Sequence, residues 1–287
     1  MKTAVVTDSN SGILQKEGTA LGLYVLPMPF TIDDKDYFED INLSQHEFYE
    51  RLNNDEDITT SQPSPRDVMK LWDGLLKEYD EIVHIPMSSG LSGACETASV
   101  LAEEYGGRVQ VVNNHRVSVT QRQSALDALE MVEKGMTAAE IKAELERSKD
   151  TSVIYITVDT LKFLKKGGRI TAAAAALGTL LKLKPVLTIL GEKLDAFAKA
   201  RTMKQAKTLM TAAVLRDLEG RLQDKNCEKT HLAVAYSQNR EAAQRFAEEL
   251  EETFPGADIY IAPLALSIAC HIGPGSLALA ATRKLEI

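Results

Sequence analysis

Short β-branched runs alternate with helix-start signals over the first 150 residues, and this alternation restricts the fold more than any other feature of the chain. Three apolar runs have the length of a strand, at residues 3–7, 81–87 and 108–112. Helix-start signals lie around them: Ser44 and Thr137 each open a capping box, and Ser64 precedes a proline at the first helical position. Strands that alternate with helices predict a layered α/β domain with a largely parallel sheet.

The same signals give the helices of this first half. We expect them at residues 44–52, 64–79, 95–105, 119–134 and 137–147. Residues 23–32 form another extended run, in which Pro27 and Pro29 cannot donate to a strand ladder. We therefore expect that run to be an irregular or edge strand.

The pattern changes after Ser152, and we place a domain boundary near residues 149–152. The second half predicts strands at 153–158, 231–236 and 258–262, with a hairpin over 185–200. Its expected helices are 160–166, closed by Gly167 and Gly168, an alanine-rich one over 171–181, and 203–222 and 239–253. The expected domains are therefore residues 1–150 and 151–287.

Composition excludes several functions for this chain of 287 residues. Its formal net charge of −8 argues against general binding to nucleic acid or to an anionic membrane. Three separated cysteines without CxxC or CxxH spacing indicate a reducing compartment and no zinc site. No apolar stretch approaches the roughly 18 residues that span a bilayer, and the first residues lack a signal-peptide core. We expect a cytoplasmic protein without stable membrane insertion.

The stretch IPMSSGLSGACETA, residues 85–98, places three serines and two glycines between an expected strand and an expected helix. A serine nucleophile on a sharp elbow requires G-x-S-x-G, whereas here Gly93 directly follows Ser92. A phosphate loop of the Walker type requires GK[ST], and the chain contains no such tripeptide. Exposed N–H groups, hydroxyls and a helix N-terminus at this corner favour an anion such as a carboxylate. A plain helix cap is the structural alternative.

Three other stretches are rich in polar groups or glycine. In TSQPSP, residues 60–65, Ser64 suffices as a cap, which leaves Thr60, Ser61 and Gln62 as surplus polar groups for a ligand. HIGPGS, residues 271–276, places a histidine beside a rigid turn, although a histidine in an apolar run is commonly a core residue. KKGGR, residues 165–169, is also explained by a helix C-terminus with favourable cations.

Taken together, these stretches resemble the DegV family. The motifs TDSNSG, TSQPSP, PMSSGLSGACETA, VDTLKFLKKGGRI, LKPVLTI and HIGPGS occur in the family's order, over about residues 3–283. The chain departs from the family pattern at Ala94 and Cys95, where a threonine and an aromatic residue are common, and at Asn113 and Asn114, which replace a frequent Asp-Ser. The resemblance implies a two-domain α/β fold, with a mostly parallel sheet in the N-terminal domain and a mixed sheet in the C-terminal domain.

The resemblance also implies a function. It predicts a non-catalytic lipid carrier that holds a long-chain fatty acid, such as palmitate or oleate, in an interdomain tunnel. The carrier presents the acid's carboxylate to the catalytic subunit of a separate fatty acid kinase, for phospholipid synthesis. No metal or cofactor is implied.

The resemblance assigns roles to individual residues of this sequence. Those expected to contact or lie close to the carboxylate are Thr60, Ser61, Ser92 and His271. The supporting loop is expected to include Ser89, Gly90 and Gly93. The positions expected to dock the kinase are Arg169 and Arg201.

Two other functions stay open on the residues alone. One is a serine esterase or thioesterase that uses Ser92 and His271. The other is a small-molecule sensor in which binding of an acid alters domain closure.

Overall fold

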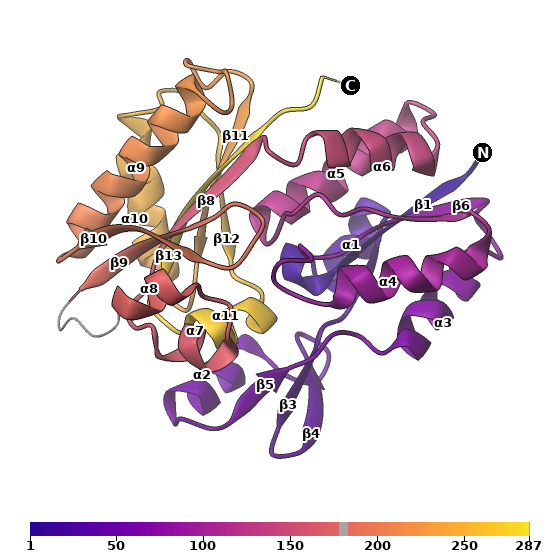
Figure 1. Ribbon diagram of the computed structural model, residues 1–287, viewed down its shortest axis with the longest axis horizontal. Helices are drawn as coiled ribbons and strands as arrows, with labels where there is room; N and C mark the ends of the chain where they lie inside the picture. Colours follow the sequence, from indigo (N-terminus) through magenta and orange to yellow (C-terminus); the bar gives the residue numbers. More distant parts are fainter. Residues whose placement is uncertain (178–182, 287) are drawn as a thin grey trace. The chain divides into compact units, whose positions relative to one another are not determined.

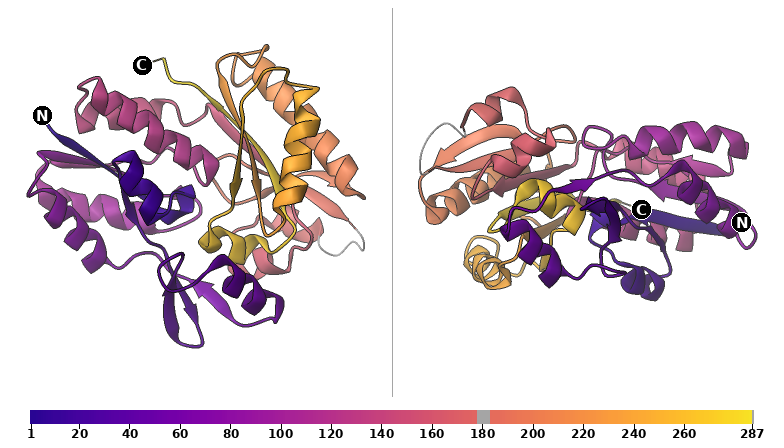
Figure 2. Two further views of the ribbon diagram at one scale, coloured as in Figure 1. Left: turned by 180° about the vertical axis from the view of Figure 1, so that it is seen from behind. Right: turned by 90° about the horizontal axis from the view of Figure 1, so that it is seen from below.

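The computed structural model describes residues 1–177 and 183–286, and it divides them into two compact units. Unit 1 comprises residues 1–149 together with Ala265–Ser267, and unit 2 comprises Asp150–Leu264 together with 268–286 (Figures 1 and 2). Each unit has its own sheet and its own buried core.

The main sheet of unit 1 has four parallel strands in the order β2-β1-β6-β7. These strands are β1 (Thr3–Asp8), β2 (Tyr24–Leu26), β6 (Glu81–Ile85) and β7 (Val109–Val111). Their β-branched residues are almost entirely buried, as expected of a parallel sheet that is covered on both faces. The carboxyl ends of parallel strands share one edge, so the loops that begin after Asp8, Ile85 and Val111 gather there.

Helices cover both faces of this sheet (Figure 1). The helices of unit 1 are α1 (Gln15–Leu21), α2 (Gln45–Asn53), α3 (Pro65–Leu75), α4 (Ala94–Ala102), α5 (Val119–Glu133) and α6 (Ala138–Arg147). Figure 1 shows α5 and α6 on one side of the sheet and α3 and α4 on the other. Trp72 of α3 and Cys95 of α4 are buried against Val6 and Ile82 of the strands.

A second, antiparallel sheet in unit 1 has the order β4-β3-β5. Its strands are β3 (Pro29–Ile32), β4 (Lys35–Phe38) and β5 (Ile58–Thr60). Phe30 of β3 packs against Phe48 of α2, with ring centroids 5.9 Å apart. This sheet places the TSQPSP stretch, because β5 ends at Thr60.

Unit 2 contains a six-stranded mixed sheet in the order β10-β9-β8-β13-β11-β12. Its strands are β8 (Ser152–Thr157), β9 (Lys184–Ile189), β10 (Asp195–Ala200), β11 (Thr230–Tyr236), β12 (Ile259–Pro263) and β13 (Leu277–Arg283). Only β11 and β12 pair in parallel; the other neighbours are antiparallel.

The helices of unit 2 are α7 (Lys162–Gly167), α8 (Ala172–Ala176), α9 (Met203–Glu219), α10 (Arg240–Glu251) and α11 (Leu266–Ile272). The first two residues of α11 are counted with unit 1. Met210 of α9 and Phe246 of α10 belong to one buried cluster with strand residues such as Leu279, so both helices cover the same face of the sheet.

The expected fold class is confirmed, with an all-parallel main sheet in unit 1 and a mixed sheet in unit 2. Both expected capping boxes form, at Ser44 and Thr137. The run at 23–32 splits into the edge strand β2 and strand β3 of the second sheet.

Some expected boundaries are wrong. The helix predicted to reach Tyr79 ends at Leu75, because the buried Leu75 is followed by Leu76 and Tyr79, which pack on the same core from a turn and so extend the apolar pattern past the helix. The helix expected over 95–105 becomes a 3₁₀ turn from Glu103. The end of the alanine-rich helix predicted over 171–181 lies outside the described residues.

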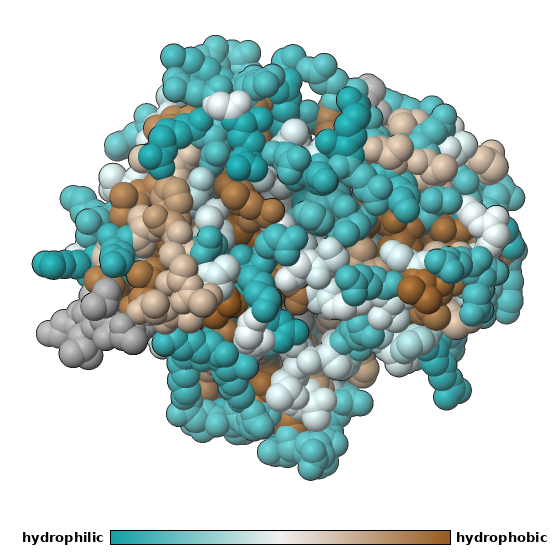
Figure 3. Space-filling model, viewed as in Figure 1, coloured by the Kyte–Doolittle hydropathy of each residue, from teal (hydrophilic) through white to brown (hydrophobic). Residues whose placement is uncertain are grey.

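Figure 3 shows hydrophilic residues over most of the visible face, interrupted by small apolar areas. The exposed large apolar side chains are separated along the chain: Met1, Ile41, Val100, Leu190, Leu215 and Tyr260. Isolated apolar side chains of this kind are ordinary on protein surfaces. Within the described residues, no helix is both long enough and apolar enough to cross a membrane.

Candidate functional site

The serine- and glycine-rich corner between β6 and α4 is closed by its own hydrogen bonds. The Ser88 carbonyl accepts from the amides of Leu91 and Ser92, at 3.0 and 3.2 Å. The Ser88 hydroxyl oxygen accepts from the amide of Gly90 at 3.2 Å. Ser89 is held from another loop, since its hydroxyl oxygen accepts from the Asn113 side-chain amide at 2.9 Å. The corner is therefore a fixed turn in which Ser88 is buried and Ser89 and Gly90 are half-buried.

Ser92 is half-buried at the end of this turn, just before α4. Its hydroxyl oxygen accepts from the amide of Ala94 at 3.2 Å. In the part of the chain that the structure describes, the Ser92 hydroxyl hydrogen has no protein acceptor, so it can donate to a ligand. The cap position of α4 is Gly93, which has no side chain to cover the helix N-terminus. A hydroxyl donor beside a helix N-terminus suits an anion.

The TSQPSP corner is joined to this turn through Gln62. The Gln62 amide nitrogen donates to the hydroxyl of Thr97, the fourth residue of α4, at 3.0 Å. A Cβ atom on Gly93 would lie 3.0 Å from Gln62 Oε1, so the absence of a side chain at Gly93 permits the close approach. Gln62 is therefore not a surplus polar group, and that expectation is wrong. Its neighbour Ser61 is exposed, with its amide bonded to the Pro29 carbonyl at 3.3 Å.

Thr60 and Ser64 flank these residues. Thr60 is half-buried and pairs with Phe30 across the second sheet. Ser64 caps α3 by accepting from the Asp67 amide at 3.1 Å, as the sequence predicts. Because Ser61 adjoins Gln62 and Ser92 adjoins Gly93, unit 1 brings the two segments that carry the predicted carboxylate ligands together.

The TDSNSG stretch forms a third corner at the same edge of the sheet, centred on the buried Asp8. Asp8 Oδ2 accepts from the amide of Met87 at 2.8 Å, and Oδ1 accepts from the amides of Asn10 and Gln121, each at 3.0 Å. Burial raises the pKa of Asp8 above its ordinary value, while these three donors oppose that shift. Asp8 thus ties its own loop to the loop that leads to Ser92.

Unit 2 contains the other predicted ligand, His271 of α11. The imidazole lies against Gly167, where a Cβ atom would come within 2.2 Å of His271 Nδ1. Burial, together with the charges of Arg169 and Lys166, lowers the pKa of His271 to about 4. The imidazole is therefore neutral at pH 7. Arg169 donates to the carbonyl of Gly167 at 2.5 Å.

The turn after His271 is fixed by one buried serine. The Ser237 hydroxyl donates to the Gly273 carbonyl at 2.6 Å and accepts from the Ser276 amide at 2.9 Å. Gly273 and Gly275 have φ values of +84° and +76°, which glycine adopts without strain. The Gly-Pro-Gly sequence thus lets the chain turn sharply from α11 into β13.

The glycines of KKGGR do end a helix, because Gly168 has a φ of +69° and its amide bonds to the Leu164 carbonyl.

Arg201, the second predicted docking residue, is exposed between β10 and α9, and its amide donates to Gln205 Oε1 at 2.9 Å. Lys184, another cation of this region, forms an ion pair with Asp159. Lys182, which the sequence also places among these cations, lies outside the described residues.

Two observations argue against a serine hydrolase. The nucleophile of a G-x-S-x-G elbow sits on a strained turn, whereas Ser92 is not among the described residues with positive φ. A general base works best with a pKa near the operating pH, whereas that of His271 is about 4. No group of three or more His, Cys, Asp or Glu residues in the described ranges 1–177 and 183–286 could hold a metal ion.

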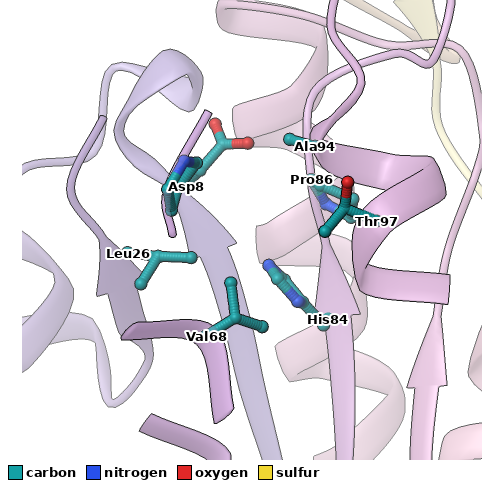
Figure 4. Close-up of a pocket in the computed structure, with 8 residues that line it drawn as sticks. Asp8, Leu26, Val68, His84, Pro86, Ala94 and Thr97 are labelled. Carbon is teal, nitrogen blue, oxygen red and sulfur yellow. The ribbon is translucent and has the colours of Figure 1, made fainter. Parts of the chain in front are cut away.

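The family departures have local explanations. Cys95 is buried, with its sulfur 3.9 Å from the Val112 carbonyl. Asn113 holds Ser89, and Asn114 donates to the Ser124 hydroxyl at 2.8 Å. Ala94 lines a small cavity whose lining also includes Asp8 (Figure 4). The hydrogen bonds of Asp8 and the place of His84 in the lining of that cavity were not predicted. The polar run after strand 3–7 gave a signal for Asp8, and the TSQPSP stretch pointed to Gln62 as a ligand group rather than as a partner of Thr97.

The topology defines an α/β protein of two units, in which unit 1 brings the TSQPSP corner and the corner after β6 together through Gln62 and Thr97. The family model described as "Uncharacterised protein, DegV family" matches residues 2–284. This chain belongs to the DegV family, and the resemblance read from the motifs is confirmed.

Two solved structures and one further relative are similar to this chain over nearly its full length, and all three are DegV proteins. The chain is 33% identical to a DegV family protein from Thermus thermophilus described for its fatty acid binding, with a TM-score of 0.89 over 99% of this chain and 100% of that one. It is 30% identical to DegV of Bacillus subtilis, described as a fatty acid binding protein, with a TM-score of 0.87 and coverage of 99% and 100%. A DegV domain-containing protein of Listeria innocua is 31% identical, with 97% of each chain covered.

Proposed function

We propose that this protein binds one long-chain fatty acid and holds its carboxylate at the corner formed by residues 60–62 and 88–93. The observation that carries the proposal is the Ser92 hydroxyl, whose hydrogen has no protein acceptor among the described residues and which lies at the N-terminus of α4, where the cap position is a glycine. Two relatives at 30% identity or above are described as binding fatty acids, which supports the same ligand here.

Hydroxyl donors suit a carboxylate that has to react. A bidentate arginine would occupy both carboxylate oxygens, whereas Ser92 and Thr60 can each donate one hydrogen bond and leave an oxygen open. His271 stays a predicted contributor from the family resemblance. With its pKa at about 4, it would act as a neutral hydrogen-bonding group rather than as a cation.

Burial of the fatty acid's acyl chain would account for tight binding. Each buried methylene stabilises the complex by about 0.8 kcal/mol, so about 15 methylenes give a gross term of about 12 kcal/mol before the cost of ordering the chain. Release into water is then slow. Transfer of the acid to a partner protein avoids that slow step.

We further propose that the protein acts as a carrier rather than as an enzyme, and presents the bound carboxylate to a separate ATP-dependent kinase that forms an acyl-phosphate. The chain has no Walker tripeptide of its own. Arg169 and Arg201 are the proposed docking cations, on a chain whose net charge is −8.

A comparison of two ligands tests the head-group assignment. Delipidated protein is titrated with palmitate and with 1-hexadecanol, which has the same number of carbons but no carboxylate. The proposal expects much tighter binding of palmitate, and it expects Ser92→Ala to reduce the difference. Equal affinities for the acid and the alcohol would contradict it.

A further inference from the structure

A small cavity in unit 1 lies beneath the three polar corners (Figure 4). Its polar lining comes from Asp8, His84 and Thr97, and its apolar walls include Leu26, Val68 and Ala94. The walls leave about 10 Å³ for the centre of a water molecule. A small cavity with several polar groups in its lining has room for an ordered water.

His84 of β6 is the polar group that this cavity leaves unexplained. Its side chain is 2% exposed, and neither ring nitrogen has a hydrogen-bond partner among the described residues. Figure 4 shows the ring facing the cavity. A neutral imidazole has one donor and one acceptor, and burial, which lowers the pKa of His84 to about 4, keeps this one neutral at pH 7. A buried polar group without a partner is costly, so a partner inside the cavity is expected.

Asp8 can accept a further hydrogen bond from a group inside the cavity. An ionised carboxylate offers about four acceptor sites. Oδ1 uses two of them for Asn10 and Gln121, and Oδ2 uses one for Met87. One site on Oδ2 is left. Thr97 has capacity as well, because a hydroxyl oxygen accepts twice and the Gln62 amide takes one of these positions.

We propose that this cavity is a binding site for one ordered water molecule, which hydrogen-bonds to the imidazole of His84 and donates to Asp8 Oδ2 or Thr97 Oγ1. A buried water commonly makes two to four such bonds. The water links His84 of β6 to the end of β1 or to the start of α4, the helix that follows Ser92.

The test uses the full chain, in a crystal structure that resolves ordered water and in solution. The crystal structure is expected to show a single water within hydrogen-bond distance of a His84 ring nitrogen and of Asp8 or Thr97. In solution, rotating-frame NMR is expected to show magnetisation transfer from a long-lived water to the His84 ring protons. A cavity filled by a side chain, or a His84 ring without a water contact in both measurements, would overturn the proposal.

A matched pair of variants separates the water from the fold. Val68→Ile adds one methyl group to the cavity wall without touching a polar group, and it should abolish the transfer signal while the protein stays folded. Val100→Ile, on the exposed part of α4, should leave the signal unchanged. A signal that survives Val68→Ile would place the water elsewhere. Neither readout depends on bound fatty acid, so this proposal and the proposed function fail separately.

Discussion

The side-chain amide nitrogen of Gln62 lies 3.0 Å from the hydroxyl oxygen of Thr97, although 35 residues separate them in the chain. Gln62 follows Ser61 at the end of the second sheet, and Thr97 lies in the first turns of the helix that follows Ser92. This contact fixes one hydroxyl-rich corner of unit 1 against the other. The proposed carboxylate site therefore depends on a residue that need not touch the ligand.

Gln62→Ala should weaken fatty acid binding and also lower the free energy of unfolding. Loss of one side-chain hydrogen bond costs about 1 kcal/mol, and the part-buried Thr97 hydroxyl loses its partner. Urea denaturation and a palmitate titration measure the two effects. Gln110→Ala is the control, because the side-chain amide of Gln110 donates to the exposed Gly107 carbonyl at 2.8 Å and not to either corner. Wild-type palmitate affinity in Gln62→Ala would show that the two corners act independently.

Ser92→Ala and Thr60→Ala should each weaken palmitate binding while the fold survives. A hydrogen bond to a charged group contributes roughly 1.5–3 kcal/mol, which corresponds to a loss of affinity of about tenfold or more. Calorimetric titration of delipidated protein measures it.

Neighbouring variants provide the controls for these two substitutions. Ser99→Ala, on the same helix as the Ser92 corner, removes a hydroxyl that bonds only to its own helix at Cys95. Thr59→Ala removes an exposed hydroxyl from the same strand as Thr60. The head-group assignment is wrong if Ser92→Ala and Thr60→Ala bind palmitate as tightly as these controls do.

Glu39 should make stability depend on pH. Burial raises the pKa of Glu39 from 4.5 to about 7, an effect that outweighs the hydrogen bond its carboxylate accepts from the Leu266 amide at 2.8 Å. Because the pKa is higher in the folded state, the contribution of Glu39 to stability is fully present below pH 4.5 and is lost as the pH rises to 7. The slope is at most about 1.4 kcal/mol per pH unit.

Glu39→Gln should remove this dependence. Its melting temperature relative to wild type should rise as the pH increases from 4.5 to about 7 and change little above that range. Glu103→Gln, an exposed substitution, serves as the control. A constant difference between wild type and Glu39→Gln over the whole range would show that Glu39 does not titrate near pH 7.

Charge reversal of Arg169 and Arg201 should impair coupling to a kinase without changing lipid affinity. Cations on an acidic chain steer an acidic partner surface, and salt screens that attraction with a Debye length of about 8 Å at physiological strength. The double variant Arg169→Glu, Arg201→Glu should form less acyl-phosphate, and the remainder should be less sensitive to salt. Arg245→Glu, on an exposed part of α10, is the control. Unaltered coupling in the double variant would remove the docking role.

The sequence predicted those helix ends and strands that are determined by a few neighbouring residues. The two capping boxes, the Ser64 cap with Pro65 and the Gly168 terminus all form as written, because each is decided within a few residues. The β-branched strands β1 and β6 were predicted for the same reason. Strand β13 was not: its alanine-rich sequence has weak strand preference, and pairing with β8 and β11 on either side makes it a strand.

The residue types of the candidate site were predicted, but its connections were not. The sequence pointed to Thr60, Ser61 and Ser92 through the excess of hydroxyls at two strand ends. It could not show that Gln62 reaches Thr97, or that Glu39 meets an amide 227 residues away. Such contacts depend on how separate loops meet at one edge of a sheet. His84 carried no signal because a histidine within an apolar strand resembles an ordinary core residue.

Mass spectrometry of lipid extracted from the denatured, purified protein tests the central claim most directly. Slow release of a buried acyl chain means that acid acquired during expression should stay bound through purification. The account predicts a long-chain fatty acid at about one molecule per chain. It also predicts that delipidated protein regains that ratio when palmitate or oleate is added. Extracts without fatty acid, together with no uptake of either acid, would contradict it.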